Sequence, residues 1–252
     1  MIGMGRVVSA FLLLCAFCCP AVAEPRIALV IANSAYTGDV AQIPFAVNDG
    51  RLIAQTLQKL GFSVTLASDV DLAATKQEVL QFSNDLRQAG PSATGLFYYA
   101  GQGVRIDGQS YVIPVNGSFR QAADFETGAL PAKSVMRQMQ SARVGIGIII
   151  LDASRDSPFP GHRIDPSEWT SDLPRDFFVA QSTGPGELSM DGDGPNSPFA
   201  TALAAEMVKP GPMIEEVLRN VRKQVMTATA GRQVPWDSSS LSKPFYFADT
   251  GL

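Results

Sequence analysis

The chain has 252 residues, of which 46% are hydrophobic and 17% are charged. This balance excludes a disordered or low-complexity chain and predicts one globular domain with a sizeable core. The formal net charge of −4 gives no electrostatic basis for contact with nucleic acid, so we expect no nucleic-acid partner.

The first 23 residues are a different kind of sequence from the rest. Arg6 precedes an apolar run at 7–19, and Ala21-Val22-Ala23 follows. This order is typical of a cleavable export signal, because the run is too short to span a bilayer comfortably. We expect 1–23 to be the signal and 24–252 a single domain, exported to the periplasm or secreted, without stable insertion in a membrane. An uncleaved membrane anchor is the alternative.

Cleavage of this signal would remove every thiol. All three cysteines lie at or before position 19. The exported chain would then hold no disulfide and no thiolate nucleophile.

Short apolar runs alternate with helical patterns along the remaining chain. In chain order, we expect strands at 26–32, 62–67, 95–100, 145–151 and 177–181, and helices at 48–60, 71–89, 132–142, 197–207 and 213–230. A small hairpin at 104–114 would turn at Asp107-Gly108, and 244–247 is expected to form a last strand. The alternation predicts an α/β domain, a mostly parallel sheet with helices on both faces.

Ligands of such sheets bind beyond the carboxyl ends of the strands. The polar and glycine residues that the sequence places there are Asn33, Tyr36, Asp49, Gly101, Gln102, Gly103, Asp152, Ser154 and Arg155. Glycines on both sides of Gln102 would let the backbone approach a bound chain closely, or would simply form a turn. We therefore expect a functional site at this edge.

Seven motifs follow one another along the chain: ALVIANSAY, VNDGRLIAQTLQKLGF, LFYYAGQGV, SYVIPV, IILDASRDSPF, DGDGPNSPF and VPWDSSSL. Together they resemble the bacterial caspase-like peptidases, relatives of the metacaspases, from about Arg26 to Phe247. The resemblance implies a caspase-like three-layer sandwich. It also implies a cysteine-type endopeptidase with histidine in a Gly-His-Gly motif and cysteine in an Asp-Ala/Ser-Cys motif.

Both catalytic positions of that family are substituted in this chain. The histidine position is Gln102 and the cysteine position is Ser154. An amide does not titrate usefully near pH 7, and a hydroxyl is a weak nucleophile unless a base activates it. We expect an inactive peptidase. The alternative is a residual hydrolase that uses Ser154 with His162, the only histidine, or a bound water as the base.

A recognition pocket is the part of the family's site that this sequence keeps. In the relatives, two aspartates hold an arginine or lysine side chain of the substrate, and these positions are Asp49 and Asp152. The resemblance also places Ala46 and Ala100 near that pocket. Each aspartate has another interpretation: Asp49 would favour a helix N-terminus, and Asp152 would pair with Arg155.

Two further motifs suggest other sites. Residues 191–197, DGDGPNS, carry oxygen ligands, but Pro195 and the lack of a downstream glutamate break the calcium-loop pattern. Trp236 is a candidate for stacking on a peptide, or packs at the end of the fold. We expect no metal and no cofactor.

The leading hypothesis is a binding module, or pseudopeptidase, for peptide or protein segments that carry arginine or lysine. A structural envelope module with a vestigial cleft is a further alternative. The sequence leaves the oligomeric state open.

Overall fold

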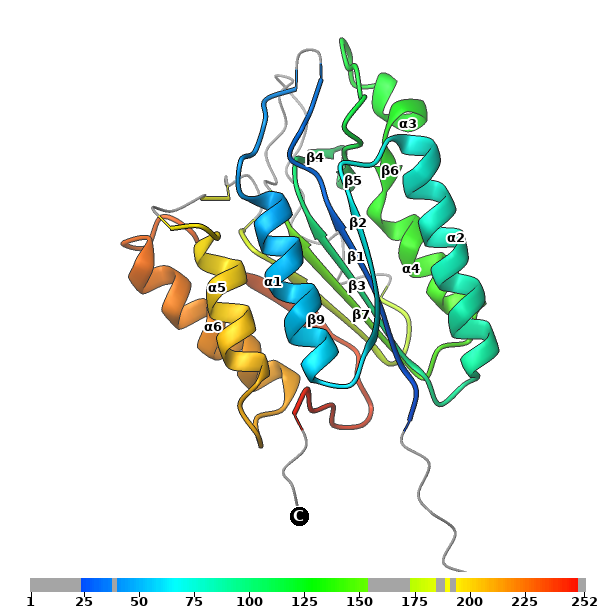
Figure 1. The fold of residues 1–252 in the computed structure, drawn as a ribbon, viewed down its shortest axis with the longest axis vertical. Helices are drawn as coiled ribbons and strands as arrows, with labels where there is room; N and C mark the ends of the chain where they lie inside the picture. Colours follow the sequence, from blue (N-terminus) through cyan, green and yellow to red (C-terminus); the bar gives the residue numbers. More distant parts are fainter. Residues whose placement is uncertain (1–23, 38–39, 154–172, 185–188, 191–193, 249–252) are drawn as a thin grey trace, which may run out of the picture.

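The computed structural model describes residues 24–37, 40–153, 173–184, 189–190 and 194–248. The described part forms a six-stranded sheet in the order β2-β1-β3-β7-β8-β9, with helices on both faces (Figure 1). The strands are β1 Arg26–Ala32, β2 Ser63–Ser68, β3 Thr94–Ala100, β7 Ile146–Asp152, β8 Phe177–Gln181 and β9 Trp236–Ser239. All neighbouring pairs are parallel except β8 and β9.

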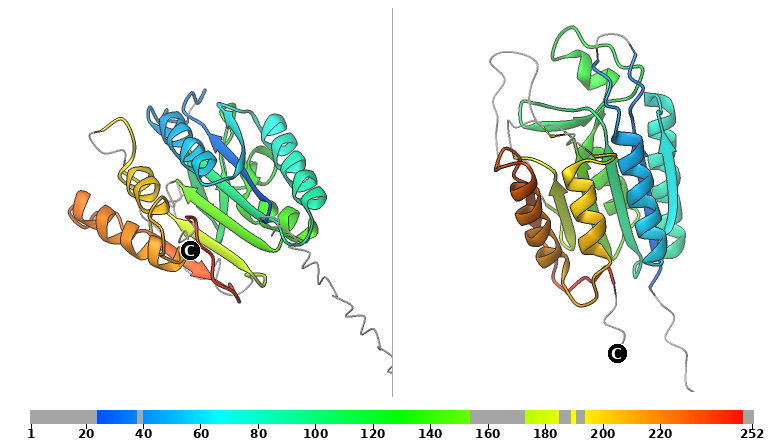
Figure 2. Two further views of the ribbon diagram at one scale, coloured as in Figure 1. Left: turned by 60° about the horizontal axis from the view of Figure 1, so that its bottom comes forward. Right: turned by 60° about the vertical axis from the view of Figure 1, so that its left-hand side comes forward.

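Six helices occur in the described part of the chain: α1 Ala46–Lys59, α2 Leu72–Ala89, α3 Asp124–Gly128, α4 Ala132–Ser141, α5 Pro198–Met207 and α6 Ile214–Ala228. Helices α1, α5 and α6 cover one face of the sheet, and α2 and α4 cover the other (Figure 2). The three layers confirm the predicted α/β sandwich with a mostly parallel sheet.

The alternation of side chains along each strand divides the core in two. In β1, Val30 packs with α1, α5 and α6, whereas the neighbouring Leu29 and Ile31 pack with α2 and α4. Strands β3 and β7 are buried along their whole length. Continuous apolar runs are what a parallel sheet covered on both faces requires.

A small second sheet lies beyond the carboxyl ends of the parallel strands. Its strands are β4 Gly103–Ile106, β5 Gln109–Val112 and β6 Leu130–Pro131, all antiparallel. The β4–β5 turn has positive φ at Asp107 (48°) and Gly108 (79°), as expected for a two-residue hairpin turn. The predicted hairpin is therefore confirmed, while α3 and β6 were not predicted.

The expected last strand at 244–247 is wrong. Tyr246 forms only an isolated bridge with Met213, whereas the last strand is β9. The apolar signal of 244–247 has another cause, since Phe245 and Phe247 are buried in the core beside α6. The Arg26 guanidinium also donates to the carbonyl of Phe247 at 2.7 Å, which ties this segment to β1.

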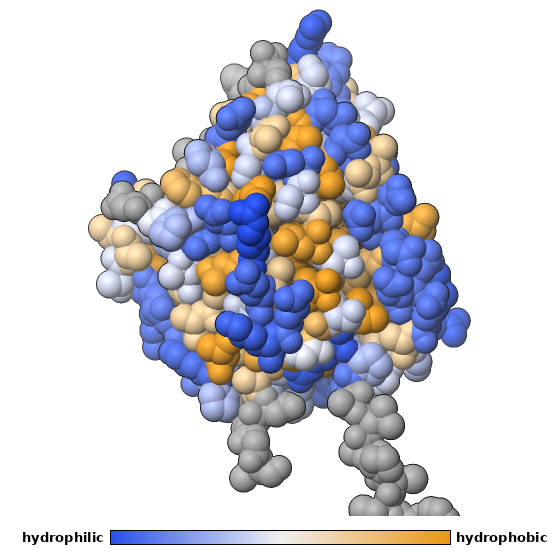
Figure 3. Space-filling view, viewed as in Figure 1, coloured by the Kyte–Doolittle hydropathy of each residue, from blue (hydrophilic) through white to orange (hydrophobic). Residues whose placement is uncertain are grey.

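The outer surface is polar over the helices and more apolar at one edge of the sheet. In Figure 3, hydrophobic atoms lie between α1 and α2, over the edge strand β2. Leu66 of β2 is 39% exposed. In the described residues, no helix is both long and apolar enough to cross a bilayer.

Candidate binding site at the carboxyl edge of the sheet

A cavity of about 310 Å³ opens at the carboxyl edge, on the face that α1 and α5 cover. It brings together six residues that the sequence singled out: Ala46, Asp49, Ala100, Gly101, Gln102 and Asp152. The other lining residues are Ala41, Gln42, Ile43, Ser189 and Ser197. We call this cavity the acidic pocket, because Asp49 and Asp152 are its only charged lining residues among those described.

Strand register explains why small and acidic side chains meet here. Ala32 of β1 pairs with Ala100 of β3, and Ala100 pairs with Asp152 of β7. Side chains of paired residues lie on the same face of a sheet. The methyl group of Ala100 beside the Asp152 carboxylate leaves room at the strand ends, where the cavity lies, whereas Ala32 packs beneath Gly50 of α1.

Asp152 is buried, with 5% of its surface exposed. Its Oδ2 accepts hydrogen bonds from the Tyr98 hydroxyl at 3.0 Å and the Ser197 hydroxyl at 3.1 Å. The Ser189 hydroxyl reaches Oδ1 at the long distance of 3.4 Å. A carboxylate oxygen has two lone pairs, so Oδ1 can accept a hydrogen bond from a ligand beside this contact.

Asp49 lies in the first turn of α1 and is 3% exposed. Its Oδ1 accepts from the Asn196 amide and from the Ser197 backbone N–H, both at 2.9 Å. Ser197 thus contacts both carboxylates, and it also caps α5 by accepting from the Ala200 N–H at 3.0 Å. This cap fixes the wall of the acidic pocket against its two aspartates.

Burial raises the pKa of Asp152 to about 7, and the negative charge of Asp49 adds to the effect. Hydrogen bonds from Ser182, Tyr98 and Ser197 act in the opposite direction. Two carboxylates in a poorly hydrated cavity repel each other, so the pair holds a proton more readily than isolated aspartates. A cation in the cavity would relieve that repulsion.

Gln102 lies on the opposite rim and is held mainly through its backbone. Its N–H donates to the Tyr36 hydroxyl at 2.6 Å, and its carbonyl accepts from the Tyr99 hydroxyl at 2.7 Å. The two tyrosine oxygens are 3.0 Å apart. The Gln102 side-chain amide donates to the Ala41 carbonyl at 3.0 Å, so it braces the wall of the acidic pocket.

The tyrosines around Gln102 cannot replace a histidine base. Burial raises the pKa of Tyr36 and Tyr99 above the usual range of a phenol, and a neutral phenol does not accept protons usefully near pH 7. Glycine at position 101 allows the tyrosine hydroxyls to lie this close to the turn, because a Cβ there would lie 2.5 Å from the Tyr36 oxygen. The hydrogen bonds of this turn fix the position of Gln102, but they supply no group that titrates near pH 7.

The other candidates from the sequence have different outcomes. Asn33 is buried and bonds the Ile113 carbonyl and the Val70 N–H, which is a structural role. Trp236 is on the edge strand β9 and is 47% exposed. Ser154, Arg155, His162 and residues 191–193 lie outside the described residues. In the described chain, no group of three or more histidine, cysteine, aspartate or glutamate residues could hold a metal ion.

Sequence reasoning missed Tyr98 and Ser197. Tyr98 lies two residues before Ala100, so strand alternation alone would have placed both on one face. Ser197 precedes Pro198, a pairing typical of a helix N-cap followed by the first helical residue. The capping signal was visible in the sequence, but the contact with both aspartates depends on tertiary structure.

The fold is an α/β sandwich with a cavity at the carboxyl edge of a mostly parallel sheet. The family model described as the caspase domain matches residues 25–246. The chain therefore belongs to the caspase-domain family. No curated protein matches the chain.

Proposed function

We propose that this protein is an exported caspase-domain protein that binds arginine- or lysine-bearing segments in the acidic pocket and does not cleave them. The observation that carries the proposal is the pair of buried carboxylates, Asp49 and Asp152, in one cavity of about 310 Å³. A buried acidic pair without a basic lining residue in the described chain attracts a cationic side chain, since water screens charges poorly there.

The shape of the acidic pocket favours a long cationic side chain. Ala46 and Ala100 line its wall, so an aliphatic stem can pack against methyl groups while its charged end reaches the carboxylates. Oδ1 of Asp152, which the Ser189 hydroxyl reaches at 3.4 Å, can accept a further hydrogen bond. The planar fork of a guanidinium can donate to such an oxygen with good geometry, which favours arginine over lysine.

The absence of cleavage is proposed from the chemistry of Gln102. Its amide is engaged with the Ala41 carbonyl and cannot take and return a proton near pH 7. General acid–base assistance contributes roughly 10²- to 10⁴-fold in rate. Loss of the base together with the replacement of cysteine by Ser154 supports a binding role.

The test is calorimetry with an arginine peptide, a lysine peptide and a citrulline peptide of otherwise equal sequence. We expect binding in the order arginine, lysine, citrulline, and a loss of at least tenfold in Asp49→Asn and Asp152→Asn, since breaking a charge-assisted contact costs about 1.5–3 kcal/mol. Glu216→Gln, an exposed change on α6, is the matched control. Equal affinity in all four proteins would refute the proposed pocket.

The same samples test the proposed lack of cleavage. The arginine peptide should be recovered intact, and a fluorophosphonate probe should leave Ser154 unlabelled. A Gln102→His, Ser154→Cys double variant should cut a fluorogenic arginine substrate if only the chemistry has been lost. Cleavage by the natural protein that Ser154→Ala abolishes would make it a serine-using hydrolase instead.

A further inference from the structure

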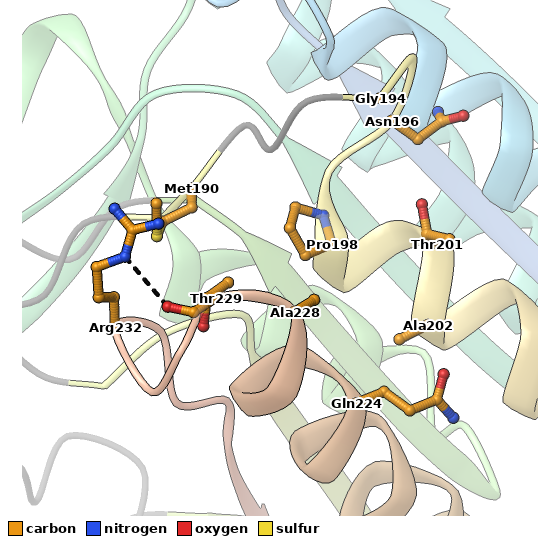
Figure 4. A pocket seen from close by; sticks show the side chains of 10 residues that line it. All are labelled: Met190, Gly194, Asn196, Pro198, Thr201, Ala202, Gln224, Ala228, Thr229 and Arg232. Carbon is orange, nitrogen blue, oxygen red and sulfur yellow. Dashed lines mark hydrogen bonds between the residues drawn. The ribbon is translucent and has the colours of Figure 1, made fainter.

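A second cavity, of about 570 Å³, lies between the start of α5 and the end of α6. Figure 4 shows Arg232 and Met190 at one end and Gln224 at the other, with Pro198 between them. No part of the proposed function uses this cavity. We call it the Arg232 cavity, because Arg232 is its only charged lining residue in the described chain.

The Arg232 cavity and the acidic pocket share two walls. Ser189 lines the acidic pocket and Met190 lines the Arg232 cavity; likewise Ser197 lines the first and Asn196 the second. At both places consecutive residues of the chain line the two cavities, so the cavities are neighbours. A ligand chain that leaves one cavity can therefore continue into the other.

The shared wall is held in place by the residues of the acidic pocket. Asn196 donates to Asp49 at 2.9 Å, and the Ser197 hydroxyl donates to Asp152 at 3.1 Å. Asn48 of α1 also donates to the Pro195 carbonyl at 3.1 Å. The two cavities are thus parts of one hydrogen-bonded structure.

The turn that carries Arg232 is built around buried polar groups. Thr229 is 2% exposed, and its hydroxyl donates to the Val225 carbonyl at 2.8 Å and accepts from the Gln233 N–H at 3.1 Å. The Arg232 Nε donates to the Thr229 carbonyl at 3.1 Å. Ala230 has a φ of 51°, a strained conformation for a residue with a Cβ and one that clusters at functional sites.

Gln233 connects this turn to the opposite rim. It is fully buried, and its amide donates to the Ser182 carbonyl at 2.8 Å and accepts from the Met190 N–H at 3.1 Å. The Gln233 side chain therefore positions Met190, while the exposed Arg232 side chain is oriented by its own hydrogen bond to the Thr229 carbonyl.

We propose that the Arg232 cavity binds a carboxylate, from aspartate or glutamate, in the same segment whose arginine or lysine enters the acidic pocket. The inference rests on the proposed function and narrows its ligand to segments with a basic and an acidic residue close together. Two neighbouring cavities whose charged lining residues in the described chain are Asp49 and Asp152 in one and Arg232 in the other match such a segment, and Arg232 sets which spacing is accepted.

The test is a peptide series in which one glutamate is moved from two to five residues away from a fixed arginine, on either side. The reference peptides carry glutamine at the same places. We expect a window of positions where glutamate improves affinity about two- to fivefold, as befits a partly exposed ion pair. Arg232→Gln should remove this preference, and Arg232→Glu should replace it with a preference for lysine. The control is Arg219→Gln, an exposed change on α6.

The outcomes separate this inference from the proposed function. If the arginine peptide binds but glutamate has no effect at any position, or keeps its effect in Arg232→Gln, the Arg232 site is refuted and the acidic pocket stands. If the affinity for the reference peptide does not depend on Asp49 and Asp152, both the proposed function and the Arg232 site are refuted.

Discussion

We expect Asp152→Asn to change how the stability of the unliganded protein depends on pH. The free energy of unfolding of the variant, compared with that of the natural chain, should increase as the pH rises. The pKa of Asp152 is raised from 3.8 to about 7, mainly by burial. The folded state therefore keeps a proton that the unfolded chain has already lost between these values. Because the folded state binds more protons, stability contributed by this group falls as pH rises from about 4 to 7 and is constant above.

The magnitude follows from the same values. At pH 5 the folded carboxyl is still neutral, and its charging is complete only above the pKa of about 7. Over these two pH units, the contribution of this group to the free energy of unfolding falls by about 3 kcal/mol. Asparagine carries no charge at any pH and has the same shape. Its oxygen can accept from Tyr98 and Ser197, and its NH₂ can donate to the Ser189 hydroxyl.

Urea unfolding followed by circular dichroism at pH 5 and pH 8 measures this effect. The free energy of unfolding of Asp152→Asn, minus that of the natural protein, should rise by about 1–3 kcal/mol between the two pH values. Titrating groups far from Asp152 cancel in this difference, whereas Asp49 interacts with Asp152, so the measured effect belongs to the pair. A difference that is constant with pH, or that falls toward pH 8, would refute the buried, proton-holding pair.

Three further predictions use the same site. Affinity for an arginine peptide should be lower at pH 5.5 than at pH 8 in calorimetry, because protonated Asp152 attracts a cation less; a pH-independent affinity would contradict this. Gly101→Ala should lower the free energy of urea unfolding by about 1–3 kcal/mol, because its Cβ would lie 2.5 Å from a buried tyrosine oxygen. Ser197→Ala should lower the free energy of urea unfolding by about 1–2 kcal/mol, because the α5 cap is lost. Ser189→Ala should lower it by less, because the Ser189 contact with Asp152 is long, at 3.4 Å.

The sequence was sufficient to predict the central sheet. Strands such as Arg26–Ala32 and Phe177–Gln181 are apolar runs whose side chains are buried on both faces, so composition and length determine them. The convergence of Asp49 and Asp152 also followed from sequence, because carboxyl ends of parallel strands meet at one edge. Their role as ligands for a basic side chain stays a prediction.

The edge of the sheet could not be predicted in the same way. Strand β9, Trp236–Ser239, has the sequence WDSS and contains no buried residue, so no hydrophobic pattern marks it. It is a strand because its backbone pairs with β8, which is a tertiary condition. The segment 244–247 gave the opposite error. Its apolar residues predicted a strand, but Phe245 and Phe247 are buried by packing against the core and not by pairing in a sheet.

The Gln102 turn and the two aspartates of the proposed recognition pocket are held by different contacts, and that separation makes the proposed non-cleaving binder physically reasonable. The Gln102 turn is held by backbone bonds to Tyr36 and Tyr99, so its course does not require a particular side chain at position 102. On the acidic side of the pocket, Ser197 contacts both Asp49 and Asp152, and these contacts do not involve Gln102. A change from histidine to glutamine removes a proton acceptor and adds a brace to the Ala41 carbonyl. Such a change can abolish chemistry and still leave the walls that select a ligand in place.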